Sequence, residues 1–551
     1  MEIINIHIGV ITITLKKITK KILNPARKGF QGKPTVETGF SDNQTISTNI
    51  QDTMKLLKAE FEYCSDIVFR EITLQLERPL GMAFVYLSGQ NKFDSNNEFI
   101  LQSIMLELPK ILAEDSGTES DFIQVLVSKF LPTMNVSLVD TFAALMETIF
   151  AGNIIMLLDH ADKAISVSVA GPEGRVIDEP DVEPSVRGPH DGFVENIDRN
   201  IALLRSRLHT SQFKTEILVL GKLTNTKICI CYVRGIASDV IVGEVKARLE
   251  RFKGNGIMAS GIVEELIEDE PYSIFPTIQN TERPDKVVGA LLEGRVGILT
   301  DNTPNALIVP CTFVSLLQAA EDYYHRSLFA TSLRILRFVA LNIALLLPAL
   351  YVAALSFHQE ILPGPLIASL MASREGVPFP TFVEVFMMEL IFEILREAGV
   401  RLPKVSGQAV STVGGLVIGE TAATAGFVSQ GVLIIVALTA VANFTIPNYE
   451  AAFTIRLLRF VFLIAASVLG IPGIILGLML VLAHLCDLRS FGVPYLSPFA
   501  PLSVGSLKDT IIRAPWWNMI YLPRFGGEKK PLRIYQNATP QKPGEQDKNN
   551  E

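Results

Sequence analysis

Residues 338–357 read FVALNIALLLPALYVAALSF, a run of twenty residues without a charged side chain. An α-helix of this length spans the roughly 30 Å hydrocarbon core of a bilayer. Arg334 and Arg337 precede the run. Because Lys and Arg collect on the cytoplasmic side of membrane helices, we expect this helix to enter the membrane from the cytoplasm. The run therefore predicts an integral membrane protein.

Apolar segments that follow this run predict further membrane helices. Residues 361–380 are rich in proline, and their apolar part is too short to cross a bilayer alone, so they predict a loop or a re-entrant piece. Residues 409–428 are rich in small side chains, which allow helices to pack closely. Residues 432–446 predict a helix that runs back across the membrane. A last apolar stretch begins at Arg456 and Arg459, is interrupted at 470–473 and ends at Leu485. We expect a helical membrane domain over residues 334–488, with about 4 to 6 spans.

Several polar side chains fall at membrane depth in these segments. The helical pattern of residues 381–396 carries three glutamates, two of which are four residues apart and therefore share a face. Carboxylates inside a membrane are costly and normally face protein or water. Alternatively, this helix lies in the interface with its acidic face among the headgroups. The candidate pore or intramembrane polar residues are Glu384, Glu389, Glu393, Glu420 and Asn443.

The charged residues concentrate before and after this apolar part, which indicates water-facing regions on both sides. Strand patterns alternate with helix patterns before the membrane, which predicts a soluble α/β or α+β region of two subdomains. We place a disordered leader at residues 1–50, because its apolar stretch precedes its basic cluster, unlike a secretory signal. The other predicted units are subdomain 1 at 51–150, subdomain 2 at 151–300, a connector at 301–333 and a cytoplasmic tail at 489–551.

Residues 179–208, EPDVEPSVRGPHDGFVENIDRNIALLRSRL, form the most unusual segment of the soluble region. Its prolines predict an extended stretch that is followed by a helix. The segment could be a catalytic carboxylate set, an anion-binding arginine site, or a structural or inter-subunit loop held by Glu–Arg ion pairs. No nucleophile–base pair accompanies it, so we favour the loop. Its candidate residues are Glu179, Pro180, Glu183, Arg187, Gly188, Pro189, Glu195, Asn200, Arg205 and Arg207.

The composition and the motifs argue against several classes of function. The net charge of −8 and the lack of a basic stripe argue against nucleic-acid binding. There is no P-loop, GxSxG, HExxH or strand–GxGxxG–helix motif, so we predict neither an enzyme nor a cofactor. The five cysteines include no CxxC pair, which indicates a reducing compartment and no metal site.

Four segments together carry a resemblance to the A subunit of spore germinant receptors, the GerA family. They are residues 179–208, SFHQEILPGPLIASLMASREGVPFPTFVEVFMMELIFEILREAGVRLP at 356–403, FTIPNYEAAFTIRLLRF at 444–460, and LRSFGVPYLSPFAPL at 488–502. The resemblance covers about residues 51–501. It implies a cytoplasmic N-terminal region of two subdomains, a place in the inner membrane of the spore, and partners in a transporter-like B subunit and a lipoprotein C subunit.

The resemblance also implies a role: such receptors sense nutrients and trigger germination with early ion release. The A subunit is expected to oligomerise into the ion-conducting element, and the nutrient is expected to act on it indirectly, through the receptor complex. In one place the chain departs from the family, whose small-residue helix resembles GQAAVEAG, whereas residues 419–426 read GETAATAG. The acidic position differs, so no pore role is transferred to this helix residue by residue.

Three functions remain in view from the sequence. The favoured one is a receptor subunit that forms or gates an ion path. A nutrient transporter would need inverted repeats with paired broken helices, and the sequence offers one clear interruption, at Pro472. A membrane-anchored scaffold for the receptor complex would need only packing from the small residues and the glutamates.

Overall fold

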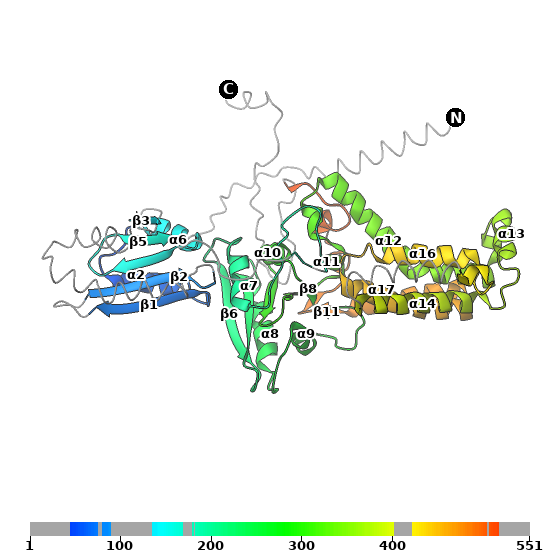
Figure 1. Ribbon diagram of the computed structural model, residues 1–551, viewed down its shortest axis with the longest axis horizontal. Helices are drawn as coiled ribbons and strands as arrows, with labels where there is room; N and C mark the ends of the chain where they lie inside the picture. The colour runs from blue at the N-terminus through cyan, green and yellow to red at the C-terminus, as the bar shows by residue number, and fades with distance from the viewer. Residues whose placement is uncertain are drawn as a thin grey trace, which may run out of the picture.

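The computed structural model describes residues 44–74, 80–89, 135–168, 179–180, 182–401, 421–503 and 506–516. Figure 1 shows three parts in a row: a first sheet at one end, a second sheet in the middle and a bundle of helices at the other end. Residues 90–134 of the predicted subdomain 1, most of the predicted leader, and Glu420 lie outside the described residues. The leader prediction reached slightly too far, because Ile46 and Ile50 are buried in the core of the first part.

The first subdomain is an antiparallel sheet with the strand order β1-β2-β4-β5-β3. Two helices pack on one of its faces around the buried side chains of Met54, Leu57 and Leu145. The elements that the structure describes here are α2 (Ile50–Glu60), β1 (Ile67–Leu74), β2 (Leu80–Leu87), β3 (Asn135–Val139), α6 (Phe142–Phe150), β4 (Ile154–Leu158) and β5 (Ala164–Ser168).

The predicted boundary at residue 150 is therefore wrong. Strands β4 and β5 were assigned to subdomain 2, but β4 pairs with β2, and β5 pairs with β3. The order of strands along a chain does not say which sheet each joins, and the pairing of β2 with β4 closes a loop of more than sixty residues. Subdomain 1 extends to Ser168.

The second subdomain is also an antiparallel five-stranded sheet, with the order β6-β7-β9-β10-β8, but helices cover both of its faces. Strand β7 shows why: Ile228 and Ile230 point into the core with α8 and α9, whereas Cys229 and Cys231 point into the core with α7 and α10. The elements are α7 (Ile197–Arg205), β6 (Phe213–Leu220), β7 (Thr226–Val233), α8 (Asp239–Glu250), α9 (Ser260–Ile267), β8 (Gln279–Thr281), α10 (Pro284–Leu292), β9 (Val296–Thr300) and β10 (Ala306–Val309). The sheet thus continues past the predicted end at residue 300.

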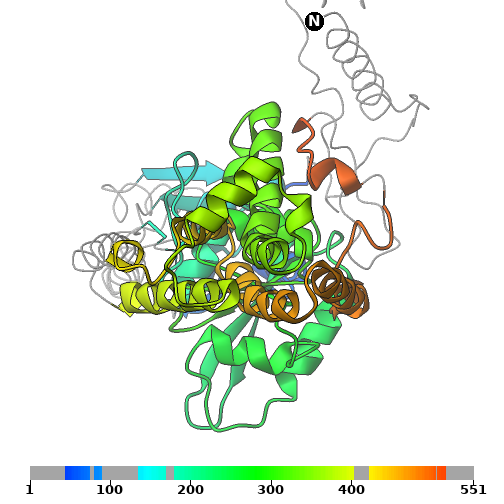
Figure 2. The same cartoon turned by 90° about the vertical axis from the view of Figure 1, so that its right-hand side faces the viewer.

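A short connector, α11 (Phe313–Leu317) and the 3₁₀ helix η2 (Ala320–Tyr323), leads into the bundle. Two described helices are long and apolar enough to cross a membrane, α12 (Ser327–Ser356) and α17 (Tyr449–Leu469). Helices α16 (Gln430–Asn443) and α18 (Ile471–Asp487) are apolar but shorter. The other helices among the described residues of the bundle are η3 (Gln359–Ile361), α13 (Gly364–Ala372) and α14 (Thr381–Arg401). Figure 2 views the bundle from its free end.

The structure shows how the last apolar stretch divides into helices. The interruption at residues 470–473 separates two helices, α17 and α18, and Gly470 occupies the left-handed region with φ 66°. Arg456 and Arg459 lie inside α17 instead of opening it. Part of the predicted proline-rich loop forms α13.

The chain returns to the soluble region after α18. Strands β11 (Arg489–Ser490) and β12 (Val493–Pro494) form a small hairpin, and η4 (Ser506–Asp509) follows. Phe491 and Val493 are buried in the same core as α8, α9 and the second sheet. The first part of the predicted tail therefore belongs to the folded protein.

Candidate functional site

The segment 179–208 joins the two subdomains through a buried ion pair. The Arg205 Nε and Nη2 atoms donate to the two carboxylate oxygens of Asp66, at 2.7 and 2.8 Å. The side chains of Arg205 and Asp66 are 0% and 3% exposed. Asp66 precedes β1 of subdomain 1, whereas Arg205 ends α7 of subdomain 2. Thr215 on β6 donates a third hydrogen bond to Asp66 at 2.7 Å. All three donors to this carboxylate thus belong to subdomain 2.

Other predicted residues of this segment form local contacts. Asn200 holds the turn before α7, since its side-chain oxygen accepts from the Val194 amide at 2.8 Å and its amide donates to the Val194 carbonyl. The Glu195 carbonyl accepts from the Asn302 amide at 2.8 Å, which ties the segment to the turn between β9 and β10. Arg207 pairs with Asp191 inside the segment.

The N-terminal half of the segment lies against α10 and the connector. Glu183 accepts from Lys286 at 2.6 Å. Exposed Glu179 pairs with His190 at 2.8 Å, and this hydrogen bond lowers the pKa of Glu179. The sequence predicted Glu–Arg pairs, but no ion pair among the described residues of this segment joins Glu to Arg: the glutamates pair with His190 and Lys286, and the arginines with Asp66 and Asp191.

Backbone geometry fixes the middle of the segment. Gly188 has φ 135°, and a Cβ there would lie 2.7 Å from the Tyr324 ring, so only glycine fits. The Pro189 carbonyl accepts from Arg283 at 3.1 Å, and Pro180 is buried. Arg187 is exposed, and the described residues provide no ion pair for it.

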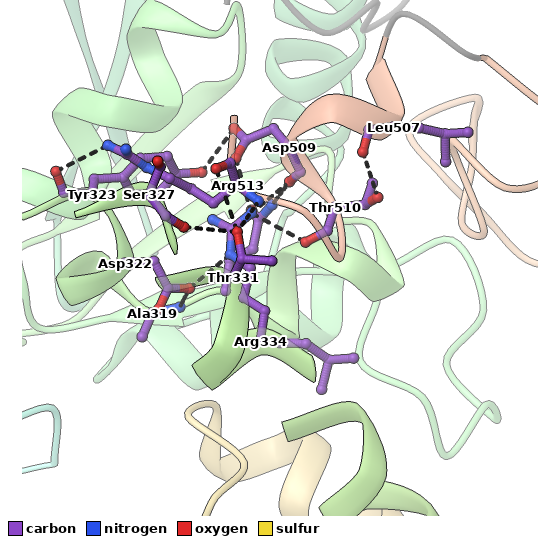
Figure 3. A network of polar contacts seen from close by, with 12 residues as sticks. Ala319, Asp322, Tyr323, Ser327, Thr331, Arg334, Leu507, Asp509, Thr510 and Arg513 are labelled. Carbon is purple, nitrogen blue, oxygen red and sulfur yellow. Dashed lines mark hydrogen bonds and ion pairs between the residues drawn. The ribbon is translucent and has the colours of Figure 1, made fainter. Parts of the chain in front are cut away.

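A second polar network, the Arg334 clamp, joins α12 to the C-terminal segment (Figure 3). We define it as Asp322, Arg334, Asp509 and Thr510. Arg334 donates to Asp322 at 3.0 Å, to the Asp509 carboxylate at 2.9 Å and to the Thr510 carbonyl at 3.1 Å. Arg334 and Asp322 are buried. Arg334 therefore does not meet lipid headgroups, as a cation flanking a membrane helix usually would.

A cavity of about 630 Å³ lies beside the clamp. Its wall combines α10, the connector and the C-terminal segment, and includes Asp285, Arg295, Tyr323, Tyr324 and Trp516. The volume suits a small molecule. Asp285, however, already accepts from Arg283 and from the Tyr324 hydroxyl, at 2.8 and 2.6 Å. Burial raises the pKa of Asp285, but these two hydrogen bonds outweigh it and leave this pKa below its ordinary value.

The predicted intramembrane glutamates of α14 are paired inside the chain. Glu389 forms a buried ion pair with Arg459 of α17, and Glu393 pairs with Arg456 at 2.6 Å. Glu384 accepts from Arg374 at 3.1 Å and from the Ser429 amide and hydroxyl.

Asn443 at the end of α16 is also buried. In the orientation of its side-chain amide that gives both the oxygen and the nitrogen a partner, the oxygen accepts a hydrogen bond from Arg396 at 3.0 Å. The sequence left protein, water or headgroups as surroundings for these glutamates, and the partners described here are basic and polar groups of the same chain. Sequence spacing alone could not reveal Arg456 and Arg459 as partners, since each lies more than sixty residues from the glutamate that it pairs with.

No group of three His, Cys, Asp or Glu side chains suitable for a metal ion occurs among the described residues.

Comparison with known proteins supplies the context for these sites. The family model described as Bacillus/Clostridium GerA spore germination protein matches residues 55–525. Spore germination protein KA of Bacillus subtilis (strain 168) is 44% identical over 473 residues, which cover 86% of this chain and 85% of that protein. An uncharacterized membrane protein of the same organism, YfkQ, is 40% identical and covers 89% of this chain and 95% of its own length.

A third relative, spore germination protein A1 of the same organism, is 39% identical over 85% of this chain and 94% of its own. Among solved structures, the N-terminal domain of the A subunit of the Bacillus megaterium spore germinant receptor GerK3 aligns with 49% of this chain and 98% of its own. The identity is 29% and the TM-score 0.39.

Proposed function

Since this chain belongs to the GerA family of Bacillus/Clostridium spore germination proteins, we propose that it is the A subunit of a nutrient-sensing receptor that triggers germination. The match over residues 55–525 carries this proposal, because it includes the soluble region, the bundle and the C-terminal hairpin together. Relatives named as germination proteins cover most of their own length with it. The protein acts as a receptor component and not as an enzyme.

We place the protein in the inner membrane of the spore as a multi-pass subunit, with its N-terminal region in the cytoplasm. The apolar helices α12 and α17 support membrane insertion. Its partners are a transporter-like B subunit, a lipoprotein C subunit and further copies of the chain. Exposed Arg187, in a segment otherwise held by internal contacts, is available to such a partner. Arg187→Ala should therefore lower the abundance of the complex and leave the nutrient dose-response unchanged.

The same subunit, in this proposal, forms or gates an ion path. The ion pairs of α14 with α17 fix the packing of helices inside one chain, because a charge buried in an apolar bundle needs its partner. An ion path between copies of the chain then needs other polar groups. Residues 409–428, with their small side chains and Glu420, are the candidates for its lining.

Ion flux across vesicles tests the proposal. The purified chain is reconstituted alone, and then with the B and C subunits plus candidate nutrients. We expect flux only with partners and nutrient, and Glu420→Gln should change the flux while the complex still assembles. Glu397→Gln, on the exposed end of α14, is the matched control. Unchanged flux in the Glu420 variant would remove the pore role.

A scaffold without an ion path is the second candidate. One observation favours it: Glu384, Glu389 and Glu393 all contact groups of their own chain. An intact complex that shows no flux under any combination of partners and nutrients would support this function instead.

A further inference from the structure

One turn of the second subdomain reaches down to the membrane helices. Residues 270–273 form a β-turn in which the Ser273 amide donates to the Glu270 carbonyl at 3.0 Å. Pro271 occupies the second position of the turn, where its fixed φ is favourable. Tyr272 occupies the third position and is 98% exposed, and Ile274 just after the turn is 40% exposed.

Contacts on both sides hold this turn rigidly to the bundle. The Ser273 hydroxyl bonds with His484 of α18 at 2.9 Å and accepts from the Phe275 amide at 3.2 Å. The Thr454 hydroxyl of α17 donates to the Ile274 carbonyl at 2.5 Å. Phe275 is buried in the core of the bundle. The backbone around Tyr272 is therefore anchored, although its side chain projects away from the protein.

The level of the turn along the bundle follows from the helix contacts. The Arg459 guanidinium of α17 donates to the Ala344 carbonyl of α12 at 2.9 Å, which places these two residues at the same height. Further along, Gly470 after α17 lies against Phe357 and His358 after α12, so the two helices run side by side in the same direction.

The apolar run of α12 begins at Phe338, six residues before Ala344. Six residues before Arg459 is Phe453, so the membrane boundary crosses α17 beside Thr454. Thr454 is the residue that holds Ile274. On α18, His484 lies one turn before the end of the helix. Both anchors of the turn thus lie where the apolar core of the bilayer gives way to the headgroups.

A single exposed tyrosine is common on protein surfaces, so exposure alone does not indicate a contact of Tyr272. Its position at the boundary of the bilayer does. Tyrosine and tryptophan are enriched at the interface of the membrane, because the ring enters the apolar region and the hydroxyl remains in water. We propose that the Pro271–Tyr272 turn rests on the bilayer, with the Tyr272 ring among the lipid headgroups, and fixes the height of the soluble region above the membrane. This inference rests on membrane insertion of α12 and α17 and not on an ion path.

The nature of the lipid follows from the charges of the turn. Glu270 is exposed, whereas Asp269 is engaged by Arg248 at 2.6 Å. The turn offers no cation of its own. Its contact with the bilayer is therefore apolar and aromatic, and it does not require anionic lipid.

Quenching of fluorescence by brominated lipid tests the contact. The full-length chain carrying Tyr272→Trp is reconstituted into vesicles of zwitterionic lipid with bromine on the upper acyl chain. The signal of the unsubstituted chain, which contains two tryptophans, is subtracted. We expect the added emission to fall by at least half. Leu138→Trp, 46% exposed on β3 at the far end of the molecule, is the control without quenching (Figure 1).

A second control separates failure of this contact from failure of membrane insertion. Met479→Trp, 63% exposed on α18, should be quenched whenever the bundle lies in the bilayer. Quenching at 479 without quenching at 272 would overturn the proposal while α18 remains in the membrane. Shielding of residue 272 from aqueous acrylamide without lipid quenching would assign the turn to a second protein chain, and quenching that needs anionic lipid would contradict its aromatic basis.

If Tyr272→Trp does not fold, a cysteine label provides the same information. Cys486 is the exposed cysteine of the chain, and the other four are buried. Tyr272→Cys in a Cys486→Ser background can carry an environment-sensitive dye. In vesicles, we expect the dye at residue 272 to emit at a shorter wavelength than the same dye on a matched Leu138→Cys variant. Equal spectra at the two sites would overturn the proposal.

Discussion

Arg205 of subdomain 2 and Asp66 of subdomain 1 form a two-pronged ion pair that is shielded from water. Arg205→Ala leaves the Asp66 charge buried without its partner, which should lower the free energy of unfolding by about 3–5 kcal/mol. Thermal unfolding of the purified chain measures this loss. Arg207→Ala, whose pair with Asp191 is partly exposed, should cost about 1 kcal/mol or less. Equal losses in the two variants would contradict the role of Arg205 as a lock between subdomains.

The Arg334 clamp predicts a change in the C-terminal segment. Arg334→Ala removes the hydrogen bonds to Asp509 and Thr510. Residues 506–516 should then become sensitive to trypsin under conditions in which the unsubstituted chain is protected. Arg326→Ala, which replaces an exposed arginine just before α12, is the control and should leave the protection of residues 506–516 unchanged. Unchanged protection in the Arg334 variant would show that other contacts hold the segment.

The ion pair of Glu389 with Arg459 predicts that substitution of Glu389 acts mainly on the stability of the bundle and not directly on ion conduction. Glu389→Gln leaves Arg459 buried without a countercharge, and should destabilise the bundle by roughly 3–5 kcal/mol. Glu397→Gln breaks an exposed pair on the same helix and should cost under about 1 kcal/mol. Unfolding in detergent measures both. A fully stable Glu389 variant with altered ion flux would instead indicate direct contact of Glu389 with ions.

Glu264 on α9 predicts a dependence of stability on pH. Burial, with the charges of Glu450 and Glu268, raises the pKa of Glu264 to about 8. The folded chain thus keeps a proton that the unfolded chain, with a pKa of roughly 4.3, releases. The stabilisation is present below about pH 4 and is lost as the pH rises toward 8. Glu264→Gln should flatten this slope in thermal unfolding from pH 5 to 8, whereas Glu265→Gln, which is exposed, should not.

Cys486 reports on the side of the membrane that holds the soluble region. It lies at the end of α18, next to the hairpin that packs on subdomain 2. A thiol reagent that does not cross membranes should label inverted vesicles and leave right-side-out vesicles unlabelled. The reverse pattern would place the N-terminal region outside the cytoplasm.

Local patterns in the sequence predicted much of the secondary structure and less of its assembly. The helix α7, which follows the extended stretch of residues 179–208, and the long helix α12 were both predicted from the sequence. Sheet membership of β4 and β5 depends on contacts between distant residues, and the sequence placed both strands in the wrong subdomain.

The ion pairs escaped prediction for the same reason. Arg205 and Asp66 are 139 residues apart, and Arg334 and Asp509 are 175 apart. Each of these residues alone is an ordinary charged side chain. A buried carboxylate in α14 predicted that a partner exists, but only the fold identifies Arg459 as that partner.

The C-terminal hairpin makes the helical bundle an insertion within subdomain 2. Phe491 and Val493 complete a core whose other members were synthesised before α12. The ribosome must therefore produce helices α12 to α18 before the last apolar surface of the soluble core can be covered. Until then that surface stays open to chaperones and proteases, so closure of the hairpin reports that the bundle has been made in full.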